Sequence, residues 1–424
     1  MEQLLAYARQ FERQVWIQSL GRCLFLAGYG LFQFYLPIVF VNQVGFSATA
    51  VGVGLSSASL AGAAGKFASG SLAESPRWGR KKTLLLAVSL VIVALLLLAI
   101  ADEFPLFWGA TVLLGLGASM YWPVSNAALT DLTAPQQRNE GFALLGVAES
   151  LGLALGVAMG SGLLAWLERG QLLFAIDSLV MLAFLGVMQA LSAETRPAAE
   201  AVPSALSGWG TALRDKWLGM FLGANLLFTT YFALANNALP LYFANFVLGD
   251  RDGSAIGSIT SLLSWQIAFG ALLQLPVARW LGRLTRASAL LVAMLLWGVG
   301  LLLVWMTGVS PAPPLAIAPV ALGTIALASV AYQPFAGAIV AELAPRSLRG
   351  VYAALSAQCW SVGYALGPLV GGWALDRGPP LAHNGWLALA VTSIAGLIAL
   401  SLLERAPSRL ASEMSPTPSR VLSD

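Results

Sequence analysis

The sequence predicts an all-α membrane protein with twelve transmembrane helices in two pseudo-symmetric six-helix bundles. The first reason is composition: 58% of the 424 residues are hydrophobic and 10% are charged, whereas a soluble domain has about 25% charged residues. The second is the length of the uncharged blocks, such as 84–100 and 287–308, which approach the roughly 20 residues that a helix needs to cross a bilayer. Blocks of this length are too long for barrel strands. The third is an internal repeat that relates the two halves of the chain.

We expect the spans at residues 15–41, 47–73, 83–101, 105–131, 140–166, 171–191, 217–247, 254–278, 287–308, 312–341, 350–375 and 385–403. The polar stretch after the sixth span is rich in Ala, Pro and Ser, which is typical of a linker. The expected organisation is an N-terminal six-helix bundle (1–191), a cytoplasmic linker (192–216), a C-terminal six-helix bundle (217–405) and a disordered cytoplasmic tail (406–424).

The distribution of Lys and Arg predicts the orientation of the spans. Eighteen of these 23 residues lie in the terminal segments and in the loops on the same side of the membrane, and three lie in the opposite loops. Loops rich in Lys and Arg stay in the cytoplasm. We therefore expect a multi-pass protein of the plasma (inner) membrane with both termini in the cytoplasm. The remaining two cations, Arg22 and Lys66, lie inside spans.

The internal repeat has an offset of 211 residues. Shifting the chain by this amount superimposes the fourth and fifth spans on the tenth and eleventh, so that Tyr121 meets Tyr332 and Pro123 meets Pro334. Duplicated six-span halves are a recurrent transporter architecture, with the solute site near the midplane between the halves.

The same offset superimposes an acid and an arginine at the cytoplasmic ends of these spans. Asp131 meets Glu342, and Arg138 meets Arg349. These four residues are candidates for a cytoplasmic gate that pairs with neighbouring loops when this side is closed. Helix capping, combined with the rule that loops rich in Lys and Arg stay in the cytoplasm, explains these four residues equally well. Both interpretations therefore stay open.

The loop after the second span reads Gly70-Ser-Leu-Ala-Glu74, then Arg77-Trp78-Gly79-Arg80-Lys81. This series resembles the corresponding loop of the major facilitator superfamily, in particular of its twelve-span drug:proton antiporter branch. That family has Gly-x-x-x-Asp-Arg-x-Gly-Arg-Lys at this place, and this chain has a related series with Glu in place of Asp and an inserted Ser-Pro. The matching residues are Gly70, Glu74, Arg77, Gly79, Arg80 and Lys81. The resemblance implies the major facilitator fold and a cytoplasmic gate in which Glu74 faces the start of the eleventh span.

Glycine-rich patterns in the fifth and eleventh spans extend this resemblance. The eleventh span contains the Gly-Pro-x-x-Gly-Gly pattern that antiporters of this family usually have in the fifth, while the fifth span here lacks the Pro. The fourth span also lacks the intramembrane Arg of many drug:proton antiporters. We expect these positions to pack helices closely: Gly152, Gly156, Gly160, Gly363, Gly367, Pro368, Gly371 and Gly372.

Four charged residues lie inside predicted spans, where charges are costly and usually functional. Arg22, Lys66 and Glu149 each lie about eight residues, roughly 12 Å, from the cytoplasmic end of their spans, so the three can meet in one layer. Glu149 is then a proton-coupling candidate, and Asp177 is a second one. The alternatives are a structural ion network or snorkelling of the cations, and for Asp177 a position at the external interface.

Aromatic and amide side chains are distributed around these charges. Such a set suits an apolar or amphipathic solute, although each member is equally suited to an interhelical hydrogen bond. Together with Arg22 and Lys66, the candidates for the solute cavity are Tyr29, Gln33, Trp122, Asn126, Tyr231, Asn236, Asn237, Gln266, Tyr332, Gln333 and Gln358.

No pattern in the sequence indicates an enzyme, a cofactor or a metal. There is no Gly-x-x-x-x-Gly-Lys-Ser/Thr loop for a nucleotide and no metal-ligand spacing. The sole histidine, His383, is expected in an external loop, which argues against an imidazole proton relay. The net charge of +3 gives no reason to expect a nucleic acid partner.

Two functions remain open from the sequence. The first is a secondary active transporter that works by alternating access and exports small hydrophobic or amphipathic compounds in exchange for protons. The second is a uniporter or symporter of a small metabolite. An anionic metabolite would suit this site, because Arg22 and Lys66 outnumber the nearby acid. In both cases we expect a monomer in the lipid bilayer whose partner is a small solute.

Overall fold

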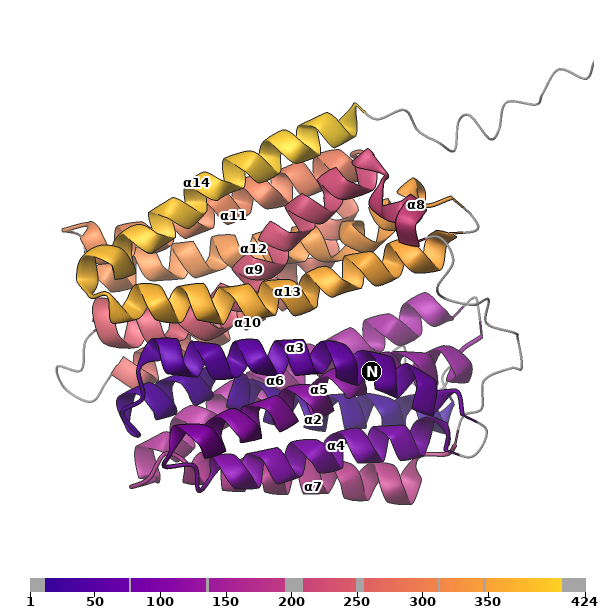
Figure 1. The fold of residues 1–424 in the computed structure, drawn as a ribbon, viewed down its shortest axis with the longest axis horizontal. Helices are drawn as coiled ribbons and strands as arrows, with labels where there is room; N and C mark the ends of the chain where they lie inside the picture. The colour runs from indigo at the N-terminus through magenta and orange to yellow at the C-terminus, as the bar shows by residue number, and fades with distance from the viewer. Residues whose placement is uncertain are drawn as a thin grey trace, which may run out of the picture.

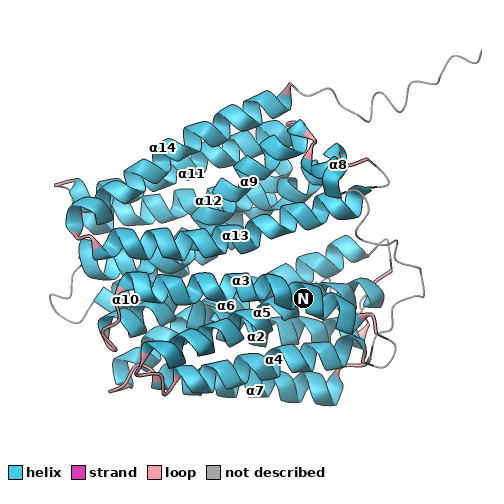
Figure 2. Cartoon of the chain, in the orientation of Figure 1, coloured by secondary structure: helices cyan, strands magenta, loops and turns pink. Residues whose placement is uncertain are grey.

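The computed structural model describes residues 12–75, 78–134, 137–194, 209–248, 255–311, 313–345 and 348–405. Throughout these ranges every regular element is a helix (Figures 1 and 2). Arg77, most of the predicted linker and the predicted tail lie outside the described residues.

The N-terminal half consists of six long helices: α2 (Arg13–Asn42), α3 (Ala48–Ala73), α4 (Gly79–Leu98), α5 (Phe104–Leu132), α6 (Arg138–Trp166) and α7 (Leu172–Leu191). The C-terminal half begins with a short helix, α8 (Trp209–Leu213). Its six long helices are α9 (Lys216–Tyr242), which continues as the π-helical η1 (Phe243–Leu248), α10 (Ala255–Leu281), α11 (Arg286–Val309), α12 (Pro314–Leu343), α13 (Arg349–Asp376) and α14 (Pro379–Glu404).

The twelve long helices confirm the predicted fold class, with ends that differ by a few residues. The largest difference is in α14, which begins six residues before the predicted 385 because two prolines occupy its first turn, where a missing N–H costs nothing. His383, expected in a loop, therefore lies inside this helix.

Eleven of the helices are long and apolar enough to cross a membrane, among the described residues. The twelfth, α13, is not one of them, although its 28 residues span a similar length. It packs between α3 and α9, and glycines replace large apolar side chains along these contacts. A helix that faces other helices needs less hydropathy than one that faces lipid, so we count α13 as a span.

The two halves have the same internal arrangement (Figure 1). In the first half α2 packs against α6 and α7, and in the second half α9 packs against α13 and α14. The halves meet where α3 contacts α13, α6 contacts α10 and α2 contacts α9. The start of α2, α8 and the end of α14 lie at one end of the bundle. We call this the terminal end and the opposite one the far end.

Glycines bring α6 close to α2 in the first half. A methyl group added at Gly152 would overlap the backbone oxygen of Cys23, and one added at Gly156 would overlap that of Ala27. Gly160, one turn further on, faces the ring of Tyr35. The predicted packing role of this face thus corresponds to backbone-to-backbone contact with α2.

The second half repeats this contact between α13 and α9. Gly363 packs on Thr229, Gly367 packs on Ala233, and Gly371 faces Ala238. Gly372 lies on a different side of α13 and packs on the backbone of Ala48 in the other half. Pro368 likewise lies next to the other half, because its carbonyl oxygen contacts Gly52.

We predict that Gly156→Ala lowers the stability of the detergent-solubilised protein. The added methyl group meets backbone that cannot move aside, and such overpacking costs about 1–3 kcal/mol. Thermal unfolding followed by size-exclusion chromatography measures the loss. Gly162→Ala on the same helix is the matched control, because an added methyl group there meets nothing within 4 Å. Equal melting temperatures for the two variants would contradict the assigned contact.

Candidate functional site

A buried arginine and a half-buried glutamate meet in the middle of the first half. Arg22 is 4% exposed, and its Nε lies 3.8 Å from Oε2 of Glu149, which is 39% exposed. This distance is too long for a hydrogen bond, so the two interact as an ion pair. Arg22 also donates a hydrogen bond of 2.7 Å from Nη2 to Oδ1 of Asn126, and its guanidinium lies 4.7 Å from the ring centroid of Trp122.

The guanidinium of Arg22 is only partly satisfied by hydrogen bonds. Its Nε and Nη1 are buried without a hydrogen-bond partner among the described residues. A buried cation with few hydrogen bonds depends on each of the partners that it has. The hydrogen bond to Asn126, the charge of Glu149 and the aromatic face of Trp122 therefore all contribute to its stabilisation. Any change in the charge of Glu149 acts directly on Arg22.

The other two intramembrane charges lie elsewhere. Lys66 donates from Nζ to Oγ of Ser361 at 3.3 Å, across the boundary between the halves, so the structure brings together only two members of the expected triad. Asp177 is fully buried and contacts Gly28 on α2, so its carboxylate lies inside the bundle. Both of its carboxyl oxygens lack a hydrogen-bond partner in the described part of the chain.

Aromatic and amide groups of both halves surround the ion pair. Tyr29 packs edge-to-face on Trp122 with ring centroids 6.3 Å apart, and it lies close enough to Glu149 and Tyr364 to interact electrostatically with both. From the second half, Asn236 donates a hydrogen bond of 2.8 Å to the hydroxyl of Tyr364. We call the following residues the central cluster: Arg22, Tyr29, Trp122, Asn126, Glu149, Asn236 and Tyr364.

Several predicted cavity residues lie outside the central cluster. Tyr231 is fully buried and its hydroxyl bonds with Thr392 on α14 at 2.6 Å. Tyr332 is 2% exposed and donates to Asn225 at 2.6 Å. Gln333 is exposed on α12. The positions of the remaining candidates are as follows: Gln33 and Asn237 bond to each other across the two halves at 3.1 Å, and Gln266 and Gln358 are half-buried on α10 and α13.

Tyr364, Ser361 and Asn225 are polar contacts that the sequence analysis missed. A second repeat offset could have found Asn225, because the first helix of each half is related by 203 residues and not by 211. At this offset Arg22 corresponds to Asn225, and Phe25 corresponds to Phe228. Phe25 stacks on Tyr121 with centroids 3.6 Å apart, and Phe228 packs on Tyr332 at 4.7 Å. The charged position of the first half is thus a neutral amide in the second.

The repeated acids form repeated ion pairs at the terminal end. Arg80, at the start of α4, pairs with Asp131 at the end of α5. Arg286, at the start of α11, pairs with Glu342 at the end of α12, with Nη1 2.9 Å from Oε2. Each arginine also donates to a backbone carbonyl one turn earlier on the acid's helix. The acids are therefore bound within their own half, whereas Arg138 and Arg349 are exposed.

Lys81 and Gly79 attach α4 to the end of α7. Lys81 donates from Nζ to the carbonyl oxygens of Gln189 at 2.9 Å and Ser192 at 2.7 Å. Gly79 has a φ of +81°, and a side chain there would collide with the carboxylate of Glu194, which accepts from the N–H of Lys81 at 3.1 Å. The carboxylate at this helix start is favourable because the start of a helix is electropositive.

The expected latch between Glu74 and α13 is open in this conformation. Glu74 is exposed and forms no ion pair with another described residue. An added methyl group at Gly70, one turn before it, meets nothing within 4 Å. At the terminal end, therefore, Glu74 has no ion-pair partner and Gly70 no close neighbour among the described residues of the second half.

Hydrogen bonds join the halves mainly towards the far end. Apart from the Lys66–Ser361 contact, they comprise Gln33–Asn237, Tyr35–Thr260, Asn42–Asn245, Ser56–Ala365 and the contacts of Asp376 with Ala48 and Thr49. We call this region the far-end seam. The structure therefore has its far end closed by direct contacts between the halves.

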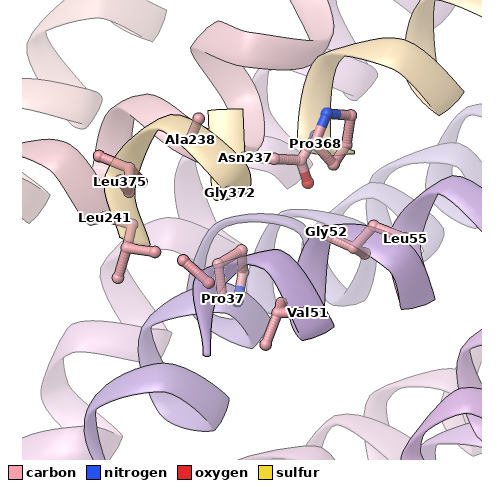
Figure 3. A pocket seen from close by; sticks show the side chains of 11 residues that line it. Pro37, Val51, Gly52, Leu55, Asn237, Ala238, Leu241, Pro368, Gly372 and Leu375 are labelled. Atoms are coloured by element: carbon pink, nitrogen blue, oxygen red, sulfur yellow. The ribbon is translucent and has the colours of Figure 1, made fainter. Parts of the chain in front are cut away.

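A small pocket lies within the far-end seam (Figure 3). Pro37, Val51 and Gly52 face it from the first half, and Pro368 and Gly372 face it from the second. Its empty volume, part of which is open to solvent, is about 240 Å³. Because this figure includes open solvent, the enclosed space is far below the roughly 300–1,000 Å³ of pockets for drug-sized ligands, and the pocket cannot hold such a solute in this conformation.

The fold and the central cluster together define a polytopic membrane protein with two repeated halves and polar groups at their interface. The sequence matches the Major Facilitator Superfamily over residues 19–254 and 248–423. The chain belongs to this family and is therefore a membrane transporter of small solutes, not an enzyme.

Relatives and solved structures agree with this assignment. The chain is 28% identical to multidrug resistance protein MdtH of Citrobacter koseri over 377 residues, which cover 86% of this chain and 88% of that protein. It is 27% identical to MdtH of Salmonella typhimurium with the same coverage. The structure of the nucleoside transporter NupG covers 93% of this chain and all of its own, with a TM-score of 0.78 and 13% identity. A mutant of the peptide transporter POT covers 93% of this chain and 95% of its own, with a TM-score of 0.78 and 14% identity.

We predict that Asn126→Ala destabilises the protein more than Glu149→Gln does. The first change removes the hydrogen bond of 2.7 Å that the buried guanidinium donates to Asn126, and hydrogen bonds to charged groups contribute about 1.5–3 kcal/mol. The second removes a contact of 3.8 Å to a partly exposed carboxylate and leaves that hydrogen bond in place, so we expect a smaller loss. Thermal unfolding of both variants in detergent measures the order. The reverse order would mean that Glu149 is the principal partner of Arg22.

Proposed function

We propose that the protein is a secondary active exporter of small hydrophobic or amphipathic compounds that is driven by proton entry. In this proposal it works by alternating access as a monomer, and the terminal end faces the cytoplasm from the plasma (inner) membrane. The names of the MdtH relatives support multidrug export, and the excess of Lys and Arg at the terminal end supports the orientation.

The observation on which the coupling proposal rests is the Arg22–Glu149 ion pair. Glu149 is partly exposed while Arg22 is buried, so a proton can reach the carboxylate without the cation leaving its site. Protonation removes the negative charge that compensates Arg22 and weakens the contact between α2 and α6. The protonated and the ionised state of Glu149 would thereby favour two different arrangements of the N-terminal half. Coupling of proton binding to a conformational change requires such a difference. Asp177 is the second proton-coupling candidate.

The solute is proposed to bind at the central cluster. Aromatic faces and neutral amides there can accommodate an apolar or amphipathic molecule in different poses. Charge is confined to the first half, since Asn236 and Tyr364 of the second half are neutral. A solute that bridges the halves would therefore contact ionic groups on one side and neutral polar groups on the other.

The alternative of a uniporter or symporter for an anion finds less support in the geometry. An anion would need a cation whose free donors face the solute, but the unbonded Nε and Nη1 of Arg22 are buried, and the residue is 4% exposed and paired with Glu149. Lys66 is bound to Ser361 across the halves. Anion binding at either cation would require breaking an existing contact.

We propose that a gate at the terminal end closes the cytoplasmic side of the transporter in one state of the cycle. Glu74 is placed at the end of α3, near the start of α13, where a carboxylate stabilises the electropositive end of a helix. The members of this gate are Gly70, Glu74, Gly79, Arg80, Lys81, Asp131, Arg138, Glu342 and Arg349, with Arg77 outside the described residues.

We predict that proton-driven accumulation depends on Glu149. Ethidium, an amphipathic aromatic cation, serves as the probe in inside-out proteoliposomes with an acidic lumen and the membrane potential clamped at zero. One proton per solute supports about tenfold accumulation for a gradient of about one pH unit, which corresponds to about 1.36 kcal/mol. Glu149→Gln should lose this accumulation and retain ethidium counterflow.

The control for this experiment is Asp102→Asn, because Asp102 forms an exposed ion pair with Arg169 within the first half, at the far end. It should accumulate ethidium as the wild type does. Accumulation without any dependence on the gradient in the wild type would refute proton coupling. Full gradient dependence in Glu149→Gln, combined with its loss in Asp177→Asn, would assign the coupling to Asp177.

We also predict that a green fluorescent protein fused after residue 424 fluoresces, whereas alkaline phosphatase fused at the same place is inactive. The first folds in the cytoplasm and the second requires the oxidising periplasm for its disulfides. Fusions at Gly45, in the turn between α2 and α3 at the far end, should give the opposite pattern. The same pattern at both sites would refute the proposed topology.

A further inference from the structure

The last residue of α13 joins the two halves at the far end. Both carboxyl oxygens of Asp376 accept hydrogen bonds from the backbone of α3: Oδ1 from the N–H of Ala48 at 2.8 Å and Oδ2 from the N–H of Thr49 at 2.7 Å. The partners are 328 and 327 residues away in the chain. Hydrogen bonds to an ionised acceptor are about twice as strong as neutral ones.

The start of α3 needs this carboxylate from the second half. The first N–H groups of a helix have no partner within the helix, and the start of a helix is electropositive. Ser47 satisfies the N–H of Ala50 locally at 3.0 Å, but Ala48 and Thr49 donate to Asp376. When the halves separate at the far end, these two N–H groups and the carboxylate must all become hydrated.

The position of Asp376 is unfavourable for its own helix. A negative charge at the end of a helix is repelled by the carbonyl groups there. The neighbouring Arg377 does not pair with it, since its guanidinium lies over the ring of Trp373 at 5.3 Å. The carboxylate is therefore stabilised by α3 of the other half rather than by α13.

Close backbone contacts lie directly beside these hydrogen bonds. Gly372, one turn before Asp376, packs on the backbone of Ala48. Further along the same two helices, Gly52 contacts the carbonyl oxygen of Pro368. These glycines line the pocket of the far-end seam (Figure 3). Asp376 thus lies at the outer edge of a region where two helices already touch through their backbones.

The antiparallel helices α3 and α13 have an acid at each end of their contact. Glu74 follows the last residue of α3 at the terminal end, where α13 begins, and Asp376 ends α13 at the far end, where α3 begins. In this structure Asp376 is bound to the partner helix and Glu74 is exposed. Asp376 is therefore bound at the end where the halves are joined, and Glu74 is exposed at the end where they are not latched together.

We propose that Asp376 is the far-end latch of the transport cycle: its carboxylate holds α3 and α13 together while the far end is closed and releases the start of α3 when that end opens. The latch rests on the alternating access of the proposed function. It is independent of which ion drives transport. Asp376 is a positioning residue in this role, because it contacts a helix of the other half and not the solute.

The test compares cysteine labelling at the two ends in Asp376→Asn and Asp376→Ala. Val51, 2% exposed in the far-end seam, becomes the far-end reporter as Val51→Cys. Gly350 at the start of α13, where an added methyl group meets nothing within 4 Å, becomes the terminal-end reporter as Gly350→Cys. Cys23 and Cys359 are replaced by Ser in every variant. A maleimide probe is applied in detergent, where both ends are reachable.

Loss of the latch should raise labelling at Val51→Cys by about tenfold, which corresponds to about 1.4 kcal/mol, and lower it at Gly350→Cys. Opposite changes at the two reporters identify a shift between conformations, whereas general loosening would raise both. Asp376→Asn keeps the shape of the side chain, so it remains informative if Asp376→Ala does not fold. Asp102→Asn is the matched control at the far end and should change neither reporter.

Unchanged labelling of both reporters in Asp376→Asn, or a rise at both ends, would overturn the latch. This outcome is separate from the proton-coupling experiment, because labelling needs neither a solute nor a pH gradient. Absence of proton-driven ethidium accumulation in the wild type would refute the proposed coupling and leave the labelling result unaffected.

Discussion

Lipid provides no hydrophobic force between apolar helices, so helix association in a membrane depends on close packing and on hydrogen bonds. In this transporter close packing occurs between α2 and α6 and between α9 and α13, where glycines allow the helices to approach each other. Both contacts lie within a half, and the central cluster rests on them. Arg22 and Glu149 are on α2 and α6, so the glycine face of α6 sets the distance between the two charges. The same rigidity allows each half to move as one body.

Sequence patterns predicted the spans, the duplication and the close packing of glycines, because hydropathy and residue size determine these features locally. They did not predict the partners of individual side chains. Lys66 bonds with Ser361 of the other half, and Tyr231 faces α14, because such contacts depend on how each helix is rotated and how the halves meet. The contact of Asp177 with Gly28, which leaves room for the carboxylate inside the bundle, was not predicted for the same reason. The 211-residue offset also missed the correspondence of α2 with α9, which differs by eight residues.

The two halves share a scaffold and differ in chemistry. Equivalent arginines at the starts of α4 and α11 form ion pairs with equivalent acids on α5 and α12. Equivalent aromatic pairs also lie near the centre of each half. At the centre, however, Arg22 of the first half corresponds to Asn225 of the second. The duplication thus preserves the interactions that hold each half together, while the ionic groups near the proposed solute site belong to one half. Substitutions at Asn225 would test the neutral half without altering the ion pair.

The placement of Arg22 and Glu149 in one half has an electrical consequence. When both are ionised, their charges move together and cancel, so the pair itself displaces little net charge through the membrane field when the first half rocks. With a proton on Glu149, the same movement displaces the positive charge of Arg22. One elementary charge that crosses the whole field is worth about 2.3 kcal/mol per 100 mV, and a partial displacement is worth a proportional part. In the proposed cycle the membrane potential therefore acts on this pair when Glu149 is protonated and hardly at all when the pair is ionised.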